Sequence, residues 1–151
     1  MPTQLDFFNQ IHLNELLAEY GGTVMGISAG SMNMAREVYI QPEEPGESVP
    51  SFRRFAPGLG LTDVSILPHY QKARSYILDG KRLYEDVTYA DSMGKTFFAL
   101  PDGSYFYQDD EGLLLCGRAY RIQNGILELL TIDGEVLDIS QLYPSKSPLQ
   151  P

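Results

Sequence analysis

Ser28 lies in the stretch VMGISAGSMNMA, between Gly26 and Gly30, and this spacing could support nucleophilic chemistry. Gly-x-Ser-x-Gly between an apolar run and a helix is typical of a nucleophile elbow, a strained turn that projects the serine hydroxyl above a sheet. Glycines are expected because side chains there would collide with neighbouring backbone. The backbone N–H of Ala29 would then face a developing oxyanion. The alternative is that Ser28 only caps a helix.

A nucleophilic serine needs a base, and His69 is the candidate for that role. It follows a predicted buried strand over residues 64–67 and the proline that ends it. This is the carboxyl end of the strand, the edge at which sites form in open α/β sheets. The alternative is a buried structural histidine. The other histidine, His12, is assigned to packing or solvent because it lies within a predicted helix.

The candidate acids are Glu43 and Glu44, in the loop between the serine and the histidine. A triad needs an acid that orients the histidine and stabilises its imidazolium form. The alternative for either glutamate is a solvated loop face.

The elements expected to position these residues are an amphipathic helix, two buried parallel strands and a later antiparallel meander. The helix is predicted from a Thr3 cap to a stop at Gly21 and Gly22, from apolar residues three and four apart. Apolar runs predict strands at 23–27 and 64–67, separated by a helix over 31–38 and a proline-rich ordered loop over 41–61. A short helix and then polar loop are expected within 73–94. Turn signals PDG, DDEG and QNG separate the meander strands at 95–100, 104–108, 113–122 and 126–132.

The fold class expected is therefore α/β, with a partial flavodoxin-like parallel sheet carrying the elbow, followed by the β meander. One domain is expected over residues 1–143, with a flexible, proline-rich tail at 144–151.

Composition excludes several classes of function. The formal charge is −9, which disfavours nucleic-acid and anionic-membrane partners. No apolar stretch approaches the roughly 20 residues of a membrane span, and there is no signal-like amino terminus. The single cysteine, Cys116, excludes an intrachain disulfide, suits a cytoplasmic protein and is read as a small buried apolar residue. No metal or organic cofactor is expected.

The elbow GISAGSMNMA, then an acidic residue, then GLGL and ILPHY resemble the peptidase family of dipeptidase E and cyanophycinase, which are serine enzymes on a class I glutamine-amidotransferase-like sheet. The resemblance implies Ser28 as nucleophile, His69 as general base and Glu43 as acid, with Glu44 as the competing choice. It also implies small peptide substrates that contain aspartate. Arg53 and Arg54 are candidate partners for a substrate carboxylate, and the alternative is that they are surface arginines.

The sequence departs from this family at its front, where complete members carry further sheet strands and a glycine-rich loop with an oxyanion donor. Loss of one such donor typically costs about 10²–10³-fold in turnover. The second hypothesis is therefore a catalytically impaired fragment or pseudoenzyme that associates through an exposed sheet edge, either with another copy or with a separate first half. An α/β-hydrolase esterase shares the elbow but usually has its histidine much later in the chain. A cysteine amidotransferase is disfavoured because serine occupies the elbow.

Overall fold

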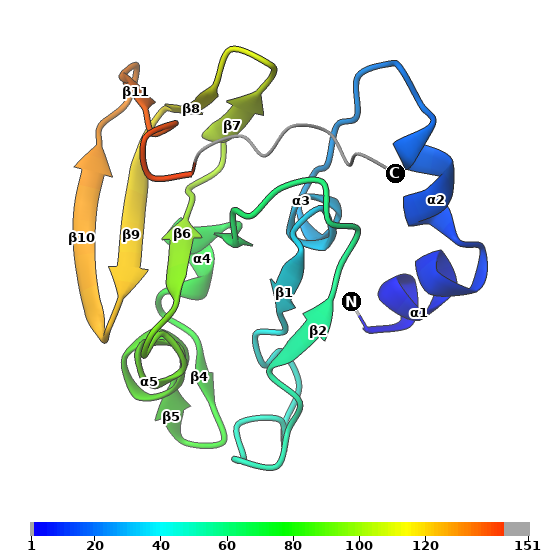
Figure 1. Ribbon diagram of the computed structural model, residues 1–151. Coiled ribbons are helices and arrows are strands. Elements are labelled where there is room, and N and C mark those ends of the chain that lie inside the picture. Colours follow the sequence, from blue (N-terminus) through cyan, green and yellow to red (C-terminus); the bar gives the residue numbers. More distant parts are fainter. Residues whose placement is uncertain (1, 144–151) are drawn as a thin grey trace.

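The computed structural model describes residues 2–143, and the predicted tail at 144–151 lies outside the described residues. Residues 2–57 form three short helices and a two-stranded antiparallel sheet (Figure 1). These elements are α1 (Pro2–Gln10), α2 (Leu13–Ala18), α3 (Ala29–Asn33), β1 (Glu37–Tyr39) and β2 (Phe55–Pro57).

The largest sheet is mixed and has four strands in the order β10-β9-β6-β3. Its strands are β3 (Ile66–Leu67), β6 (Thr96–Ala99), β9 (Ala119–Gln123) and β10 (Ile126–Thr131). β3 and β6 run parallel with Leu67 opposite Ala99, while β6–β9 and β9–β10 are antiparallel. A parallel pair joined through helical segments, with antiparallel strands beyond it, gives the α/β class that the sequence predicted.

β6 is the strand on which the two halves of the core meet. Alternate side chains of a strand point to opposite faces, and here both faces are buried. Phe97 and Ala99 pack into a cluster with the first half of the chain, whereas Phe98 and Leu100 pack into a second cluster with Leu115. Burial on both faces explains the unbroken apolar run from Phe97 to Leu100.

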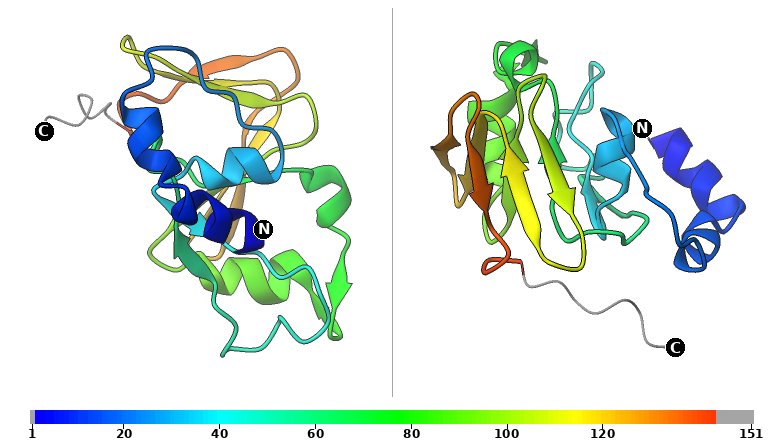
Figure 2. Two further views of the ribbon diagram at one scale, coloured as in Figure 1. Left: turned by 90° about the vertical axis from the view of Figure 1, so that its right-hand side faces the viewer. Right: turned by 90° about the horizontal axis from the view of Figure 1, so that it is seen from above.

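The second core cluster is covered by a three-stranded antiparallel sheet in the order β11-β8-β7. It consists of β7 (Tyr105–Gln108), β8 (Leu113–Cys116) and β11 (Val136–Asp138). In the view from above in Figure 2, these yellow to orange-red strands lie on the opposite side of the molecule from α1 and α2. The predicted strand at 113–122 is in fact divided between two sheets, because Gly117 has φ +86° and breaks it.

Between β3 and β6 the chain forms α4 (Tyr70–Ala73), the small hairpin of β4 (Ile77–Leu78) and β5 (Lys81–Arg82), a π-helical turn η1 (Leu83–Thr88) and α5 (Tyr89–Asp91). The sequence predicted one short helix here and then polar loop. The extra helical turns are held by apolar residues that face the core, including Leu83, Tyr84 and Val87. No helix within residues 2–143 is long and apolar enough to cross a bilayer.

The amino-terminal prediction of a single helix is wrong. The chain breaks at His12, which has φ 51°, and the first helix begins at Pro2 rather than after a Thr3 cap. Leu5 is buried in the core, but Leu16 and Tyr20 are exposed. The amphipathic sequence pattern therefore continues into α2, although the apolar residues there do not pack against the core.

The predicted buried strand at 23–27 and the predicted helix at 31–38 are also wrong in detail. Residues 23–27 are not part of a sheet, and Met25 and Ile27 are 79% and 76% exposed. A parallel strand exists only when a neighbour supplies hydrogen bonds, and β3 ends the described sheet on that side. The helix begins at Ala29, ends at Asn33 and gives way to β1.

Candidate active site

Ser28 occupies a strained backbone conformation between residues 23–27 and α3. Its φ is 52° and its ψ is −122°, a combination that side chains other than glycine rarely adopt. The turn is held by its own carbonyl, which accepts hydrogen bonds from Ser31 Oγ at 2.6 Å and from Ser31 N at 3.0 Å. A strained conformation that the surroundings hold in place is characteristic of functional positions.

The two glycines that flank Ser28 have different surroundings. A Cβ added to Gly26 would lie 2.7 Å from the carbonyl oxygen of Gly30 and 2.5 Å from Met34 Sδ. A Cβ added to Gly30 would meet nothing within 4 Å. The expected steric requirement therefore holds for Gly26 and not for Gly30.

His69 faces Ser28 from the carboxyl end of β3. Pro68 ends the strand, and His69 then adopts a left-handed conformation with φ 58° before α4 begins. Its Nε2 is 2.8 Å from Ser28 Oγ, so a hydrogen bond joins the two side chains. The structure thus brings together the serine and the histidine that the sequence paired.

Asp102 contacts the other nitrogen of the same ring. Its Oδ1 is 2.5 Å from His69 Nδ1, and its Oδ2 is 3.2 Å from Lys72 Nζ. The hydrogen bond from His69, followed by that from Lys72, lowers the pKa of the Asp102 carboxyl below its ordinary value. The carboxylate is therefore ionised at neutral pH and able to stabilise an imidazolium.

Sequence reasoning missed Asp102 because Pro-Asp-Gly was read only as a turn. A signal was nevertheless available in a repeated pattern. Pro68 and His69 follow Leu67, the last residue of β3, and Leu100-Pro101-Asp102 follows the parallel strand β6. Because the carboxyl ends of parallel strands meet at one edge, polar residues shortly after two such strands are expected to lie close together.

Glu43 and Glu44 have other partners. Their backbone N–H groups donate to Glu47 Oε2 at 2.9 and 3.1 Å, which folds the acidic loop on itself. Glu43 also lines a cavity of about 270 Å³ together with residues from 75–78. The structure does not bring Glu43 to His69, whose Nδ1 is occupied by Asp102.

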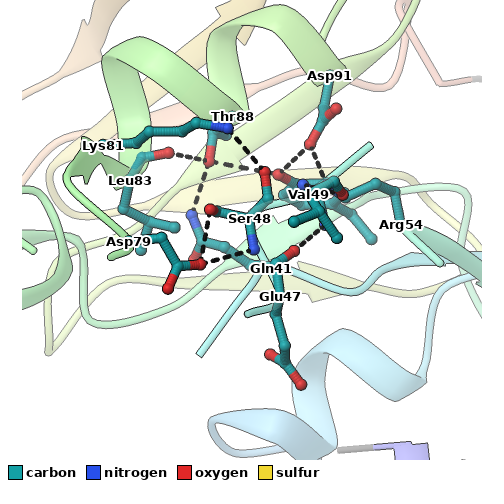
Figure 3. A network of polar contacts seen from close by, with 11 residues as sticks. Gln41, Glu47, Ser48, Val49, Arg54, Asp79, Lys81, Leu83, Thr88 and Asp91 are labelled. Carbon is teal, nitrogen blue, oxygen red and sulfur yellow. Dashed lines mark hydrogen bonds and ion pairs between the residues drawn. The ribbon is translucent and has the colours of Figure 1, made fainter. Parts of the chain in front are cut away.

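Arg54, a candidate for substrate binding, belongs to an internal network of polar contacts (Figure 3). Its Nε donates to Asp91 Oδ2 at 2.9 Å, and its Nη1 donates to the Glu47 carbonyl at 2.7 Å. The two side chains of this ion pair are only 12% and 22% exposed. Arg54 therefore anchors the loop to α5. Its neighbour Arg53 is exposed and donates from Nε to the carbonyl of Phe55.

The middle of the same loop is held by Asp79. Its carboxylate accepts a hydrogen bond from the backbone N–H of Gly46. It also accepts one from Ser48 Oγ, and Lys81 Nζ donates to the Ser48 carbonyl (Figure 3). The hydrogen bond from Ser48, followed by that from Gly46, lowers the pKa of Asp79. The loop that was expected to supply the acid is thus fixed in its middle and at Arg54 by contacts that do not involve His69.

The arrangement at the carboxyl ends of β3 and β6 can transfer a proton from a serine hydroxyl to an imidazole held by a carboxylate. Within residues 2–143, no three His, Cys, Asp or Glu side chains are grouped so that they could hold a metal ion. A serine, a histidine and a carboxylate joined in this order recur in hydrolases of unrelated folds, so the arrangement of the side chains says more than the α/β fold.

The chain belongs to peptidase family S51, whose family model matches residues 9–115. The matched region includes Ser28, His69 and Asp102 and ends within β8. This is the peptidase family of dipeptidase E and cyanophycinase that the sequence motifs indicated. Comparisons with curated proteins and with solved structures gave no match.

Proposed function

We propose that the protein is a serine peptidase in which Ser28 is the nucleophile, His69 the general base and Asp102 the acid that orients it. The observation that carries the proposal is the pair of hydrogen bonds on the His69 ring, 2.8 Å from Nε2 to Ser28 Oγ and 2.5 Å from Nδ1 to Asp102 Oδ1. Family membership supports peptidase chemistry. Asp102 replaces Glu43 and Glu44 in this assignment because it is the carboxylate in contact with the ring.

The reaction follows from the positions of the protons. As Ser28 Oγ attacks a peptide carbonyl carbon, its proton passes to His69 Nε2, and the C=O electrons move onto oxygen. When this intermediate collapses, the C–N bond breaks and the amine leaves with the proton from Nε2. Water then attacks the acyl ester while giving a proton to Nε2, and Ser28 leaves as the protonated hydroxyl.

The oxyanion would be stabilised first by the backbone N–H of Ala29. Ala29 is the first residue of α3, so its N–H has no preceding helical turn to donate to. The strained Ser28 conformation supports this part of the proposal, because in an elbow the N–H of the next residue points toward the reacting carbonyl.

The proposed substrates are small peptides, including those that contain aspartate, as the family resemblance implies. Arg53 is the better candidate of the two arginines for a substrate carboxylate, because it is exposed. The guanidinium of Arg54 is already engaged by Asp91 and by backbone carbonyls.

Reaction with a fluorophosphonate probe tests the proposal, since such probes are attacked by an activated serine. The wild-type chain is expected to become labelled, and Ser28→Ala is expected to abolish labelling. Ser51→Ala is the matched control, because Ser51 is an exposed serine of the proline-rich loop. If the folded wild-type chain remains unlabelled, or if Ser28→Ala is labelled equally, the proposed peptidase function is wrong.

The second candidate function is a binding role, in which the protein is catalytically impaired and pairs with another copy or with a separate polypeptide. It is favoured by residues 23–27, which lie outside any described sheet and expose Met25 and Ile27. Unpaired backbone beside exposed apolar side chains favours association by strand addition. Light scattering would test this: a monomer at high concentration, for both the wild type and Met25→Lys, would exclude self-association.

A further inference from the structure

Three side chains at the start of α4 contact Asp102. His69 immediately precedes the helix and binds Oδ1, Lys72 reaches Oδ2 at 3.2 Å, and Gln71 Oε1 accepts a hydrogen bond from the Asp102 backbone N–H at 3.1 Å. The backbone N–H of Tyr70 also donates to the carbonyl of Leu100 at 3.0 Å. The start of α4 and the turn after β6 are therefore joined by four separate contacts.

The need for such contacts follows from the exposure of the site. The side chains of His69 and Asp102 are 45% and 46% exposed. Water can therefore compete for both oxygens of the Asp102 carboxylate. Rotation of this carboxylate about the Cβ–Cγ bond would take Oδ1 away from the imidazole. A cation on Oδ2 opposes that rotation, because a carboxylate held at both oxygens has one preferred orientation.

We propose that Lys72 is a positioning residue for the active site: it holds Oδ2 of Asp102 so that Oδ1 stays on the His69 ring. The catalytic part of this inference rests on the proposed peptidase function. The structural part does not, because it concerns only the contact between Asp102 and His69 Nδ1.

The groups around His69 allow the contribution of Lys72 to be isolated. From the turn after β6 it faces the carboxylate of Asp102, and from the segment before α3 it faces the uncharged hydroxyl of Ser28. Its own helix supplies Lys72, which contacts Asp102, and Arg74 at the helix end. Tyr70 packs against Tyr84 and Tyr120 in the core and so turns away from the ring.

The nitrogen-15 magnetic resonance signals of the histidine rings, recorded at one alkaline pH, test the proposal in the intact protein, because they report on which ring nitrogen the proton is held. The chain has only two histidines, and His12, which is exposed beside Glu15, is an internal reference. Lys72→Met is expected to bring the shifts of the two His69 ring nitrogens closer together, because Asp102 then no longer holds the proton on Nδ1. Lys72→Arg keeps a cation on Oδ2 and is expected to restore the wild-type signals. The His12 signals are expected to stay unchanged throughout.

Arg74→Met is the matched control, because it removes a positive charge from the same segment without touching the Asp102 contact. It is expected to change the His69 ring signals much less than Lys72→Met. Unchanged His69 ring signals in Lys72→Met, or equal changes in Lys72→Met and Arg74→Met, would overturn the proposal. If Lys72→Met fails to fold, Lys72→Gln gives the same comparison.

Labelling rates separate this inference from the proposed function. Fluorophosphonate labelling is expected to slow in Lys72→Met and to recover in Lys72→Arg. If wild-type protein is not labelled, the peptidase proposal fails while the ring signals still decide whether Lys72 holds Asp102. If labelling of Lys72→Met is as fast as that of wild type although its ring signals change, Lys72 does not position the active site and the proposal is wrong.

Discussion

His69 and Asp102 meet because each follows one of two parallel, hydrogen-bonded strands at the same edge of the sheet. Leu67 of β3 lies opposite Ala99 of β6. After β3 the chain continues through Pro68 to His69, and after β6 it continues through Pro101 to Asp102. The result is the contact of 2.5 Å between Nδ1 and Oδ1. The histidine–acid pair thus depends on the sheet itself, whereas Ser28 reaches it from a strained turn outside the sheet.

The first prediction tests which carboxylate is the acid of the proposed triad. Asp102→Asn is expected to lower the fluorophosphonate labelling rate on the order of 10³–10⁴-fold, because an amide cannot stabilise the imidazolium and can favour the wrong tautomer. Glu43→Gln is expected to leave the rate unchanged, since Glu43 makes its contacts within its own loop. Equal loss of labelling in the two variants would contradict the assignment of Asp102.

The second prediction concerns the glycines around Ser28. Gly26→Ala is expected to lower the free energy of unfolding by about 1–3 kcal/mol, because the added methyl group would collide with the backbone of Gly30. Gly30→Ala is expected to change it by no more than about 1 kcal/mol, and in the stabilising direction, because alanine favours the helix and has open space there. Urea denaturation of both variants measures the difference, and equal destabilisation would contradict the described packing.

The third prediction separates the two arginines that the sequence grouped together. Arg54→Met is expected to destabilise the protein by roughly 2–3 kcal/mol, since it leaves Asp91 largely buried without its cation. Arg53→Met is expected to change stability by less than about 0.5 kcal/mol, because Arg53 is exposed. Thermal unfolding measures both effects. A neutral Arg54→Met would show that the ion pair contributes little to holding the loop.

The sequence was sufficient for those features that depend on local chemistry. Asn124 and Gly125 both have positive φ in the turn between β9 and β10, as the Asn-Gly signal predicted. The proximity of Ser28 and His69, which share a hydrogen bond, was likewise expected from a glycine pattern and a strand-ending proline. These signals are reliable because few residue types tolerate the backbone conformations involved.

The features that the sequence did not predict depend on long-range partners. The apolar run at 23–27 is as strand-like as that of β3, but only the latter finds a neighbour in β6. Similarly, Asp102 was treated as part of a turn because its role appears only when β6 lies beside β3. Local patterns give the propensity to form a strand, whereas pairing decides whether the strand exists.

The last prediction concerns the stability of the protein in acid. Asp79 is held by Ser48 and by the backbone of Gly46, and these hydrogen bonds lower its pKa below the ordinary value of 3.8. A carboxyl whose pKa is lower in the folded state stabilises that state above the unfolded pKa, and this contribution is lost as the pH falls through the folded value. Wild-type stability is therefore expected to fall below about pH 5, and the difference between wild type and Asp79→Asn is expected to be greatest at neutral pH and to shrink in acid.

Asparagine suits the left-handed backbone at position 79, where φ is 52°, so the variant tests the charge rather than the turn. Urea denaturation at a series of pH values, with the exposed Asp110→Asn as the control for net charge, measures the effect, and a pH-independent difference would contradict it.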